Sequence, residues 1–124
     1  MSIEFPIVSV VDNDESVREP LTALLRALGF AAYAFSLAGE FLSSTCIDET
    51  VCLILDIEMP GMSGPELHQE LKLRRRQIPI VSITAQSRET IRADMLRLGA
   101  VECLIKPFND KDLLRALSSA LHAN

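Results

Sequence analysis

The sequence predicts an α/β protein that is built around one parallel sheet. Short apolar runs, rich in β-branched residues, alternate strictly with longer segments in which apolar residues recur at helical spacing. Strict alternation of this kind requires right-handed crossovers, which place helices on both faces of a parallel sheet. A chain of 124 residues forms one domain, residues 1–124, and five strands in that length fit the flavodoxin-like strand order 2-1-3-4-5.

The predicted strands follow the β-rich runs. The run at 51–55 is apolar throughout, as expected of a strand that is covered on both faces. The run at 31–35 is weaker and suits the edge of the sheet. The five predicted strands are Ile7–Val11, Ala31–Phe35, Val51–Leu55, Ile80–Thr84 and Val101–Ile105.

Five helices are predicted after these strands. The first covers residues 16–28 and stops at Gly29, with a kink expected where Pro20 removes one hydrogen bond of the helix. Ser36 is the expected N-cap of a short second helix that runs through Leu42.

The three later helices show clearer apolar stripes. The third ends near Arg75 and has Leu67, Leu71 and, as a further candidate, Leu73 facing inward. The fourth covers residues 88–98 and stops at Gly99. The last is capped by Asn109 or Asp110 and carries Leu113, Leu114, Leu117 and Leu121. Two histidines in these patterns are interpreted as surface residues, His68 and His122.

The composition is that of an ordinary soluble globular protein, with 48% hydrophobic and 23% charged residues. No apolar run approaches the ~20 residues needed to cross a bilayer, and the N-terminus lacks a secretory pattern. A cytoplasmic protein without membrane contact is therefore expected. The cysteines, Cys46, Cys52 and Cys103, are odd in number and form no CxxC pair, so we interpret them as free thiols.

The formal net charge of -5 argues against direct binding of nucleic acid. The basic cluster Arg74-Arg75-Arg76 closes a helical pattern, where cations suit the negative end of the helix dipole. A solvated helix end is therefore the preferred interpretation of that cluster.

Polar side chains stand at the ends of four predicted strands. Asp12 follows the first strand and Asp56 the third, Thr84 closes the fourth, and Lys106 follows the fifth. In an open parallel sheet these ends meet at one crevice, and in the order 2-1-3-4-5 the first and third strands are neighbours there. Each residue alone has an ordinary interpretation, as a cap or a solvated side chain. Their occurrence together predicts a site centred on Asp56.

The chemistry of these four groups favours metal-assisted phosphoryl transfer. Carboxyl groups within a few ångströms raise each other's pKa unless a cation is present, and Mg²⁺ prefers oxygen ligands of this kind. Lysine and threonine add donors that suit a third, anionic species such as a phosphoryl group. An aspartate can accept that group as a covalent acyl phosphate, which makes Asp56 the predicted acceptor.

With these residues placed, the chain resembles the receiver domain of a two-component response regulator, closest in style to the NarL/FixJ transcription factors, which have the CheY-like fold. The similarity runs from Val8 to about Leu121. It rests on five motifs, which are VVDNDES with Asp12, LILDIEMPGMSG with Asp56, SITA with Thr84, LGA at 98–100 and IKPF with Lys106.

The resemblance implies that Asp56 accepts a phosphoryl group from the phosphohistidine of a sensor histidine kinase, with Mg²⁺ bound. Asp12 would help to hold the metal, usually through water, while Asp56 and the backbone carbonyl of Glu58 would ligate it directly. The chain would then be a phosphoacceptor with slow self-catalysed chemistry and not an enzyme.

The resemblance also assigns the donors. Thr84, helped by the backbone N–H of Ala85, would bind one phosphoryl oxygen, and Lys106 would pair with another. The Lys106-Pro107 peptide bond would be cis, as is usual in the family.

Two positions depart from the family pattern. Asn13 stands where a second acidic metal ligand is usual, so the amide oxygen could still coordinate but one charge is lost; an upper bound for that loss is about 4 kcal/mol. Glu58 would restore charge if its side chain turned inward, although a solvated side chain is the preferred interpretation. Cys103 replaces an aromatic residue whose rotamer often follows phosphorylation, and is also compatible with a simple buried residue.

Phosphorylation is expected to shift a two-state equilibrium at the face formed by the fourth helix, the fifth strand and the fifth helix. Candidate members of this face are Ile91, Met95, Lys111 and Arg115. The same face is the candidate surface for a homodimer. The chain holds no helix-turn-helix, so either it is a stand-alone receiver or an effector domain has been left off after Asn124.

Other functional classes stay open. A pseudo-receiver would keep the fold as a phosphorylation-independent interaction module, with the metal-phosphate switch disabled at Asn13 and Cys103. A phosphatase with an aspartyl intermediate would usually place an aspartate where this chain has Glu58. Nucleotide binding is disfavoured, because no glycine-rich phosphate loop follows the first strand.

Overall fold

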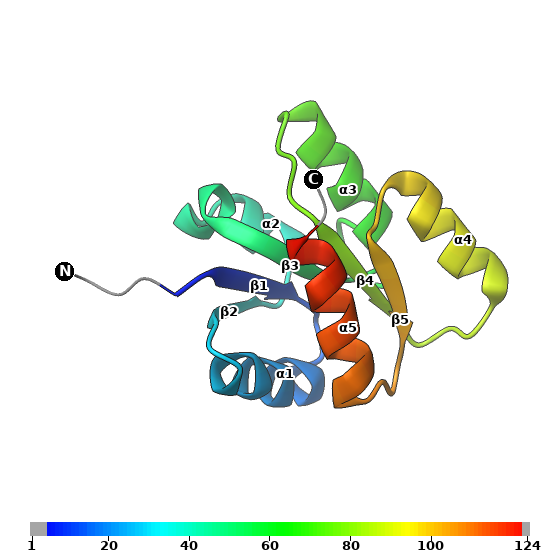
Figure 1. The fold of residues 1–124 in the computed structure, drawn as a ribbon. Coiled ribbons are helices and arrows are strands. Elements are labelled where there is room, and N and C mark those ends of the chain that lie inside the picture. Colours follow the sequence, from blue (N-terminus) through cyan, green and yellow to red (C-terminus); the bar gives the residue numbers. More distant parts are fainter. Residues whose placement is uncertain (1–4, 123–124) are drawn as a thin grey trace.

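The computed structural model describes residues 5–122 and contains a five-stranded sheet whose neighbouring strands are parallel (Figure 1). The strand order is β2-β1-β3-β4-β5, which confirms the predicted order. β3 is one residue longer at each end than predicted, and β5 begins one residue later. The strands are β1 (Ile7–Val11), β2 (Ala31–Phe35), β3 (Thr50–Asp56), β4 (Ile80–Thr84) and β5 (Glu102–Ile105).

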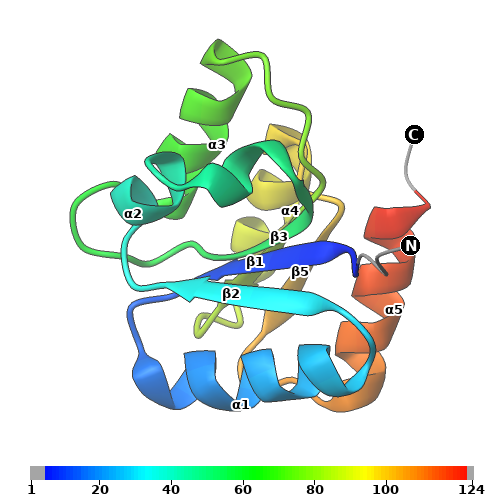
Figure 2. The ribbon, with the colours of Figure 1, turned by 90° about the vertical axis from the view of Figure 1, so that its left-hand side faces the viewer.

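Helices cover both faces of this sheet (Figures 1 and 2). On one face lie α1 (Glu15–Ala27) and α5 (Asp110–Leu121). On the other lie α2 (Ala38–Leu42), α3 (Gly64–Leu73) and α4 (Glu89–Leu98). A short 3-10 helix, Thr45–Asp48, precedes β3 and was not predicted. Within residues 5–122 no helix is long and apolar enough to cross a membrane.

Side-chain alternation in β3 explains its unbroken apolar run. Cys52 and Ile54 belong to the core cluster under α1 and α5, whereas Leu53 and Leu55 belong to the cluster under α2 and α3. All four are fully buried. The strand can be apolar at every position because it lies at the centre of the sheet and both its faces are covered.

A third, smaller core cluster lies under α4. It consists of Ile57, Met95, Ala100 and Cys103. Cys103 is 4% exposed, in agreement with its interpretation as a buried thiol. Met95 was expected to be a member of the face formed by α4, β5 and α5, but this side chain is 5% exposed and packs in the core cluster instead.

The glycine stops predicted for α1 and α4 and the Asn109 cap of α5 are confirmed, and α1 has a side-chain cap as well. Asp14 caps α1, its Oδ1 accepting a hydrogen bond of 2.9 Å from the Ser16 N–H. α1 then continues without interruption through Pro20. Gly29 and Gly99 follow α1 and α4 with φ of 99° and 113°, the left-handed backbone that favours glycine at these ends.

The prediction that Ser36 is the N-cap of α2 was wrong. The cap is Leu37, one residue later. Glu40 reaches back from the first turn and accepts hydrogen bonds from the Ser36 hydroxyl at 2.6 Å and from the Leu37 N–H at 3.0 Å. A glutamate in the third helical position has therefore taken the capping role that the serine pattern suggested.

Two predictions for α3 were also wrong. Leu73 is 70% exposed, because it lies two residues beyond Leu71 and so points away from the stripe that Leu67 and Leu71 form. His68 is 4% exposed rather than at the surface. It lines a hollow with Leu98 of α4, so α3 is covered on its α4 side as well as on its sheet side.

Gly64, the first residue of α3, packs directly on the backbone that follows β3. A Cβ at this position would lie 2.5 Å from Ile57 Cα and 3.1 Å from the carbonyl oxygen of Asp56. Only a residue without a side chain allows α3 to approach the Asp56 segment this closely.

We therefore predict that Gly64→Ala lowers the free energy of unfolding by about 1–3 kcal/mol, because backbone must move to admit the methyl group. Urea unfolding measures this change. Gly39→Ala in α2 is the matched control, since a Cβ there meets no described atom within 4 Å and alanine favours the helix. Equal effects of the two substitutions would contradict the close approach at Gly64.

Candidate functional site

The strand register brings the predicted site residues together. β1 and β3 pair in parallel with Val11 opposite Leu55, so Asp12 and Asp56, each one residue further on, lie side by side. β4 and β5 pair with Thr84 opposite Ile105, which places Lys106 directly beyond. The four side chains predicted from separate motifs thus share the carboxyl edge of the sheet.

Lys106 joins the two carboxylates. Its Nζ lies 2.9 Å from Oδ2 of Asp12 and 3.5 Å from Oδ2 of Asp56. Burial disfavours the ammonium charge, but the hydrogen bond to Asp12 and the charges of both carboxylates outweigh it, so the pKa of Lys106 is raised. The lysine therefore stays charged and neutralises part of the negative charge of the site. The Lys106-Pro107 bond is cis, as the resemblance implies.

Asp12 is fully buried and only partly satisfied. Its Oδ1 accepts a hydrogen bond of 2.9 Å from the Asp14 N–H. Its Oδ2 forms the 2.9 Å contact with the Lys106 ammonium and has no other partner among the described residues. A buried carboxylate oxygen in this state can accept a further cation.

Asp56 is 3% exposed, and its environment opposes its charge. Burial raises the pKa of Asp56 to about 6, with a further increase from Asp12; the hydrogen bond from the Glu58 N–H and the charge of Lys106 act in the opposite direction. That N–H lies 3.1 Å from Oδ1 of Asp56. The site thus holds more negative charge than its one lysine compensates.

Thr84 and Glu58 form a contact that the sequence did not reveal. The Thr84 hydroxyl donates to Oε1 of Glu58 at 2.7 Å and accepts from the Gln86 N–H at 3.0 Å. Glu58 is an exposed residue, in agreement with the preferred interpretation of a solvated side chain, yet its carboxylate accepts a hydrogen bond from Thr84. This hydrogen bond lowers the pKa of Glu58. The side chain is therefore not free to supply the charge that is lost at Asn13.

A second contact missed by sequence reasoning involves Arg18 of α1. Its Nη1 donates to the backbone carbonyl of Asp12 at 2.7 Å and so fixes the end of β1. Arg18 lies in the first turns of α1, four residues after the N-cap Asp14, so its side chain can reach back to the end of β1. Helical spacing indicates that reach, but it does not identify the acceptor, because a backbone carbonyl has no sequence signature.

The donor set fits a hard divalent cation. Two buried carboxylates, the exposed amide of Asn13 and the backbone carbonyl of Glu58 offer oxygen only, which suits Mg²⁺. Among residues 5–122 there is no group of three or more His, Cys, Asp or Glu side chains that could hold a metal. Asp12 and Asp56 would therefore carry the charge of the site, and Asn13 would contribute only a dipole.

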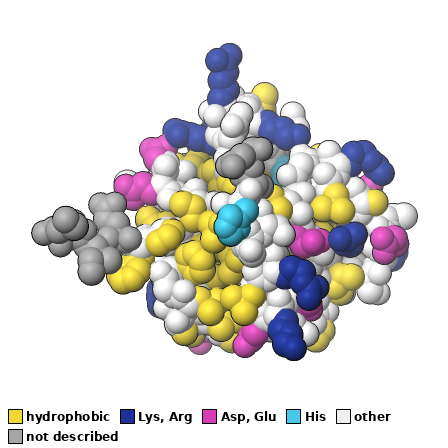
Figure 3. All heavy atoms as spheres, viewed as in Figure 1, with side chains coloured by type: hydrophobic (Ala, Val, Ile, Leu, Met, Phe, Trp, Pro, Cys, Tyr) yellow, Lys and Arg dark blue, Asp and Glu magenta, His cyan; other side chains and the backbone are white. Residues whose placement is uncertain are grey.

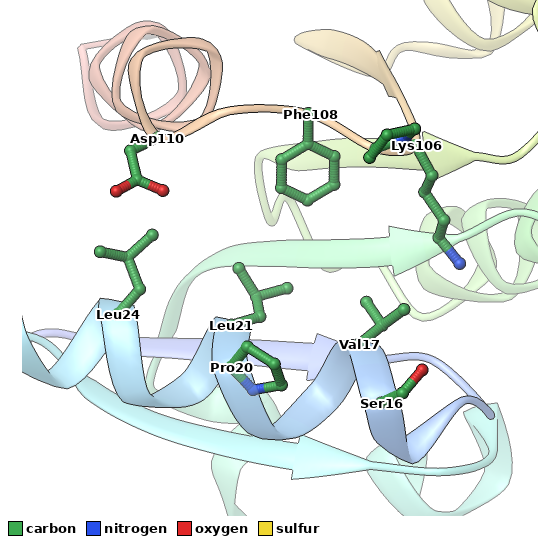
Figure 4. A pocket seen from close by; sticks show the side chains of 9 residues that line it. Ser16, Val17, Pro20, Leu21, Leu24, Lys106, Phe108 and Asp110 are labelled. Carbon is green, nitrogen blue, oxygen red and sulfur yellow. The ribbon is translucent and has the colours of Figure 1, made fainter.

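An apolar groove of about 490 Å³ begins at Lys106 and runs between α1 and the segment that joins β5 to α5 (Figure 4). Leu21 and Val17 of α1 lie on one side of it and Phe108 on the other. Ser16 and Lys106 lie at one end of the groove (Figure 4), and the ammonium group of Lys106 contacts Asp12 and Asp56 there.

The other titratable residues in the described range, 5–122, show no comparable arrangement. Burial raises the pKa of Cys52 to about 12 and also raises that of Cys103, so neither thiol is a ready nucleophile. Lys111 and Arg115 are exposed on α5, as predicted for the outer face, and Ile91 of α4 is half-buried. Basic and acidic side chains are interspersed over the face shown in Figure 3, without a continuous basic surface there.

A family model described as the response regulator receiver domain matches residues 8–118. The chain belongs to this receiver family. Nodulation protein W of Bradyrhizobium diazoefficiens is 42% identical over 114 residues, which cover 92% of this chain and 50% of that protein. The response regulator TodT of Pseudomonas putida is 36% identical over 121 residues, which cover 98% and 53% respectively. The receiver chain thus spans about half the length of these relatives.

Solved structures agree with this assignment. The crystal structure of FixJ-N superposes with a TM-score of 0.84 at 30% identity, and covers 100% of this chain and 98% of that one. The response regulator StyR superposes with a TM-score of 0.86 at 45% identity, over 97% of this chain and 61% of that one. Receiver domains of this kind generally bind Mg²⁺ for phosphorylation.

The raised pKa of Asp56 predicts a dependence of stability on pH. Between about pH 4 and pH 6 Asp56 is more protonated in the folded receiver than in the unfolded chain, so the contribution of Asp56 to the free energy of unfolding falls as the pH rises through that range. Asp56→Asn lacks this loss. Allowing for screening, we expect the variant to be about 1–2 kcal/mol more stable than wild type near pH 7 in a metal chelator, and little different below about pH 4.

Urea unfolding at the two pH values tests this prediction. Asp94→Asn is the control, because Asp94 is an exposed carboxylate that pairs with Arg97 on α4. A stability difference for Asp56→Asn that is absent near pH 7, or that is the same at both pH values, would show that the charge of Asp56 is not opposed by the fold.

Proposed function

We propose that this receiver accepts a phosphoryl group on Asp56 from the phosphohistidine of a sensor histidine kinase, and that the modification switches a protein-interaction surface. The observation that supports this most is the position of Asp56, a buried carboxylate whose charge is opposed by burial and by Asp12 and offset by Lys106. Binding of a cation next to such a carboxylate, or transfer of its negative charge to a more exposed group, lowers the free energy of the site.

In the proposed reaction, Oδ of Asp56 attacks the phosphorus atom and the P–N bond of the phosphohistidine breaks. The imidazole nitrogen keeps the electron pair of that bond, and an acyl phosphate forms on Asp56. Mg²⁺, when bound, neutralises charge on the transferred phosphoryl oxygens and on the carboxylates. Asp12, Asn13, Asp56 and the Glu58 carbonyl are the groups that would hold it.

The other residues bind the phosphoryl oxygens in this proposal. Lys106 already lies within 3.5 Å of Asp56 Oδ2 and would pair with an oxygen of the new group. Thr84 and the Ala85 N–H would donate to another. No residue is proposed to turn over a separate substrate, so the receiver is a phosphoacceptor rather than an enzyme.

The output follows from the same family assignment. We propose that α4, β5 and α5 form the responsive face, with Ile91, Lys111 and Arg115 as members and with a homodimer as one form of the output. The matched relatives are about twice as long as this chain, and one of them is the transcriptional regulatory protein FixJ. We therefore propose that an effector region, rather than this acidic receiver, contacts DNA.

A pseudo-receiver is the second candidate, and the observation that favours it is the amide at Asn13. With two carboxylates instead of three, metal binding would be weaker and phosphorylation slow. The receiver would then act through its surface without the covalent switch.

Incubation with Mg²⁺ and acetyl phosphate or phosphoramidate should add the mass of one phosphoryl group to the wild-type protein. The adduct should be absent in Asp56→Asn, because the acceptor oxygen is replaced by an amide, and it should disappear in hydroxylamine, which cleaves acyl phosphates. Intact-protein mass spectrometry measures both. An adduct that persists in Asp56→Asn would show that another residue is the acceptor, whereas no adduct at high Mg²⁺ would favour the pseudo-receiver.

Asn13→Asp should tighten Mg²⁺ binding by about tenfold or more, because it adds a third carboxylate next to Asp12 and the upper bound for such a charge is about 4 kcal/mol. Isothermal titration calorimetry measures the affinity. Asn109→Asp is the charge-matched control, since aspartate also serves as an N-cap for α5. Equal affinity of wild type and Asn13→Asp would show that position 13 does not reach the metal.

A further inference from the structure

The single hydrogen-bond donor of the Thr84 hydroxyl is already in use in the described structure. It donates to Oε1 of Glu58 at 2.7 Å and accepts from the Gln86 N–H at 3.0 Å. A hydroxyl carries one proton and can donate one hydrogen bond at a time. Thr84 itself is 1% exposed, so water cannot easily replace the carboxylate as its partner.

Glu58 is well placed to accept the hydrogen bond that the Thr84 hydroxyl donates. Its backbone N–H donates to Asp56 Oδ1 at 3.1 Å, so one residue contacts both the acceptor carboxylate and the threonine. The contact joins the segment after β3 to the end of β4, 26 residues later in the chain. Because the acceptor is a carboxylate, the hydrogen bond is charge-assisted and stronger than one between neutral groups.

We infer that Glu58 is a positioning residue that competes with the phosphoryl group for the hydroxyl of Thr84. This inference rests on the proposed function, in which Thr84 donates to a phosphoryl oxygen on Asp56. The two hydrogen bonds exclude each other, so Glu58 must release Thr84 before the phosphoryl group can be bound fully. Glu58 is exposed, and its freed carboxylate would be solvated by water.

The consequence is a bias toward the unphosphorylated form. Thr84 donates to an anionic acceptor in either form, so binding the phosphoryl group requires that the charge-assisted bond to Glu58 is broken first. Lys106 is not part of this exchange, because its partners are Asp12 and Asp56. Removing the Glu58 carboxylate should therefore favour the phosphoryl-bound form while it leaves the lysine contacts and the Glu58 backbone carbonyl in place.

The test is the affinity for beryllofluoride, a non-covalent mimic of the phosphoryl group, at saturating Mg²⁺ and measured by ¹⁹F NMR. Glu58→Ala should bind about threefold to tenfold more tightly than wild type, the range expected for loss of one competing hydrogen bond. Glu58→Gln should fall between them, because the amide oxygen still accepts a hydrogen bond but carries no charge. Glu70→Gln, which removes an exposed carboxylate from α3, should match wild type.

A double-mutant cycle separates competition from charge repulsion. If Glu58 acts through the hydroxyl, Glu58→Ala should give no gain in the Thr84→Ala background. An equal gain in both backgrounds would overturn the inference, because it would mean that Glu58 acts only by repelling the anion. The inference would also be overturned if wild type binds beryllofluoride and Glu58→Ala binds it with the same affinity.

The proposed function can fail separately. If neither wild type nor any variant binds beryllofluoride or is phosphorylated on Asp56 at saturating Mg²⁺, the phosphoacceptor function is wrong and the competition falls with it. If the wild type fails to bind but Glu58→Ala binds, the competition is supported in its strongest form.

Discussion

Two buried carboxylates on neighbouring strands, balanced by one ammonium group, are the interaction on which the rest of this structure depends. The register of β1 and β3 places Asp12 next to Asp56, and the lysine after β5 reaches across to both. Two buried charges of like sign on neighbouring strands are tolerated in a fold only when cations compensate them. The one lysine does so incompletely, as the raised pKa of Asp56 shows.

This incomplete balance links the fold to the chemistry. The hydrophobic clusters on both faces hold the strands in one register and therefore hold the carboxylates together. A divalent cation or protonation of Asp56 would relieve this electrostatic cost. In the proposed function, modification of Asp56 adds an anionic group that Thr84 and Lys106 would contact, so the same cation would be needed to compensate it.

Much of the fold and the centre of the site could be predicted from the sequence, because periodicity and strand ends are local signals. Asp56, Lys106 and the order of the strands follow from such signals. The burial of His68 did not, because it depends on α4 packing beside α3. The hydrogen bond between Glu58 and Thr84 was missed for the same reason, since Glu58 lies in the loop after β3, Thr84 ends β4, and no sequence period connects the two. Contacts made by tertiary packing leave no pattern in a single sequence.

The small core cluster under α4 includes the residue that directly follows Asp56. Ile57 follows Asp56 directly and shares its packing with Met95, Ala100 and Cys103. Because protein interiors are close-packed, a displacement of Ile57 has to be accommodated by the thioether and the thiol that touch the same space. In this chain, α4 therefore packs on the segment after Asp56 through two sulfur-containing side chains. A shift of that segment can be passed to α4 through this packing, without a rotamer change of one particular side chain.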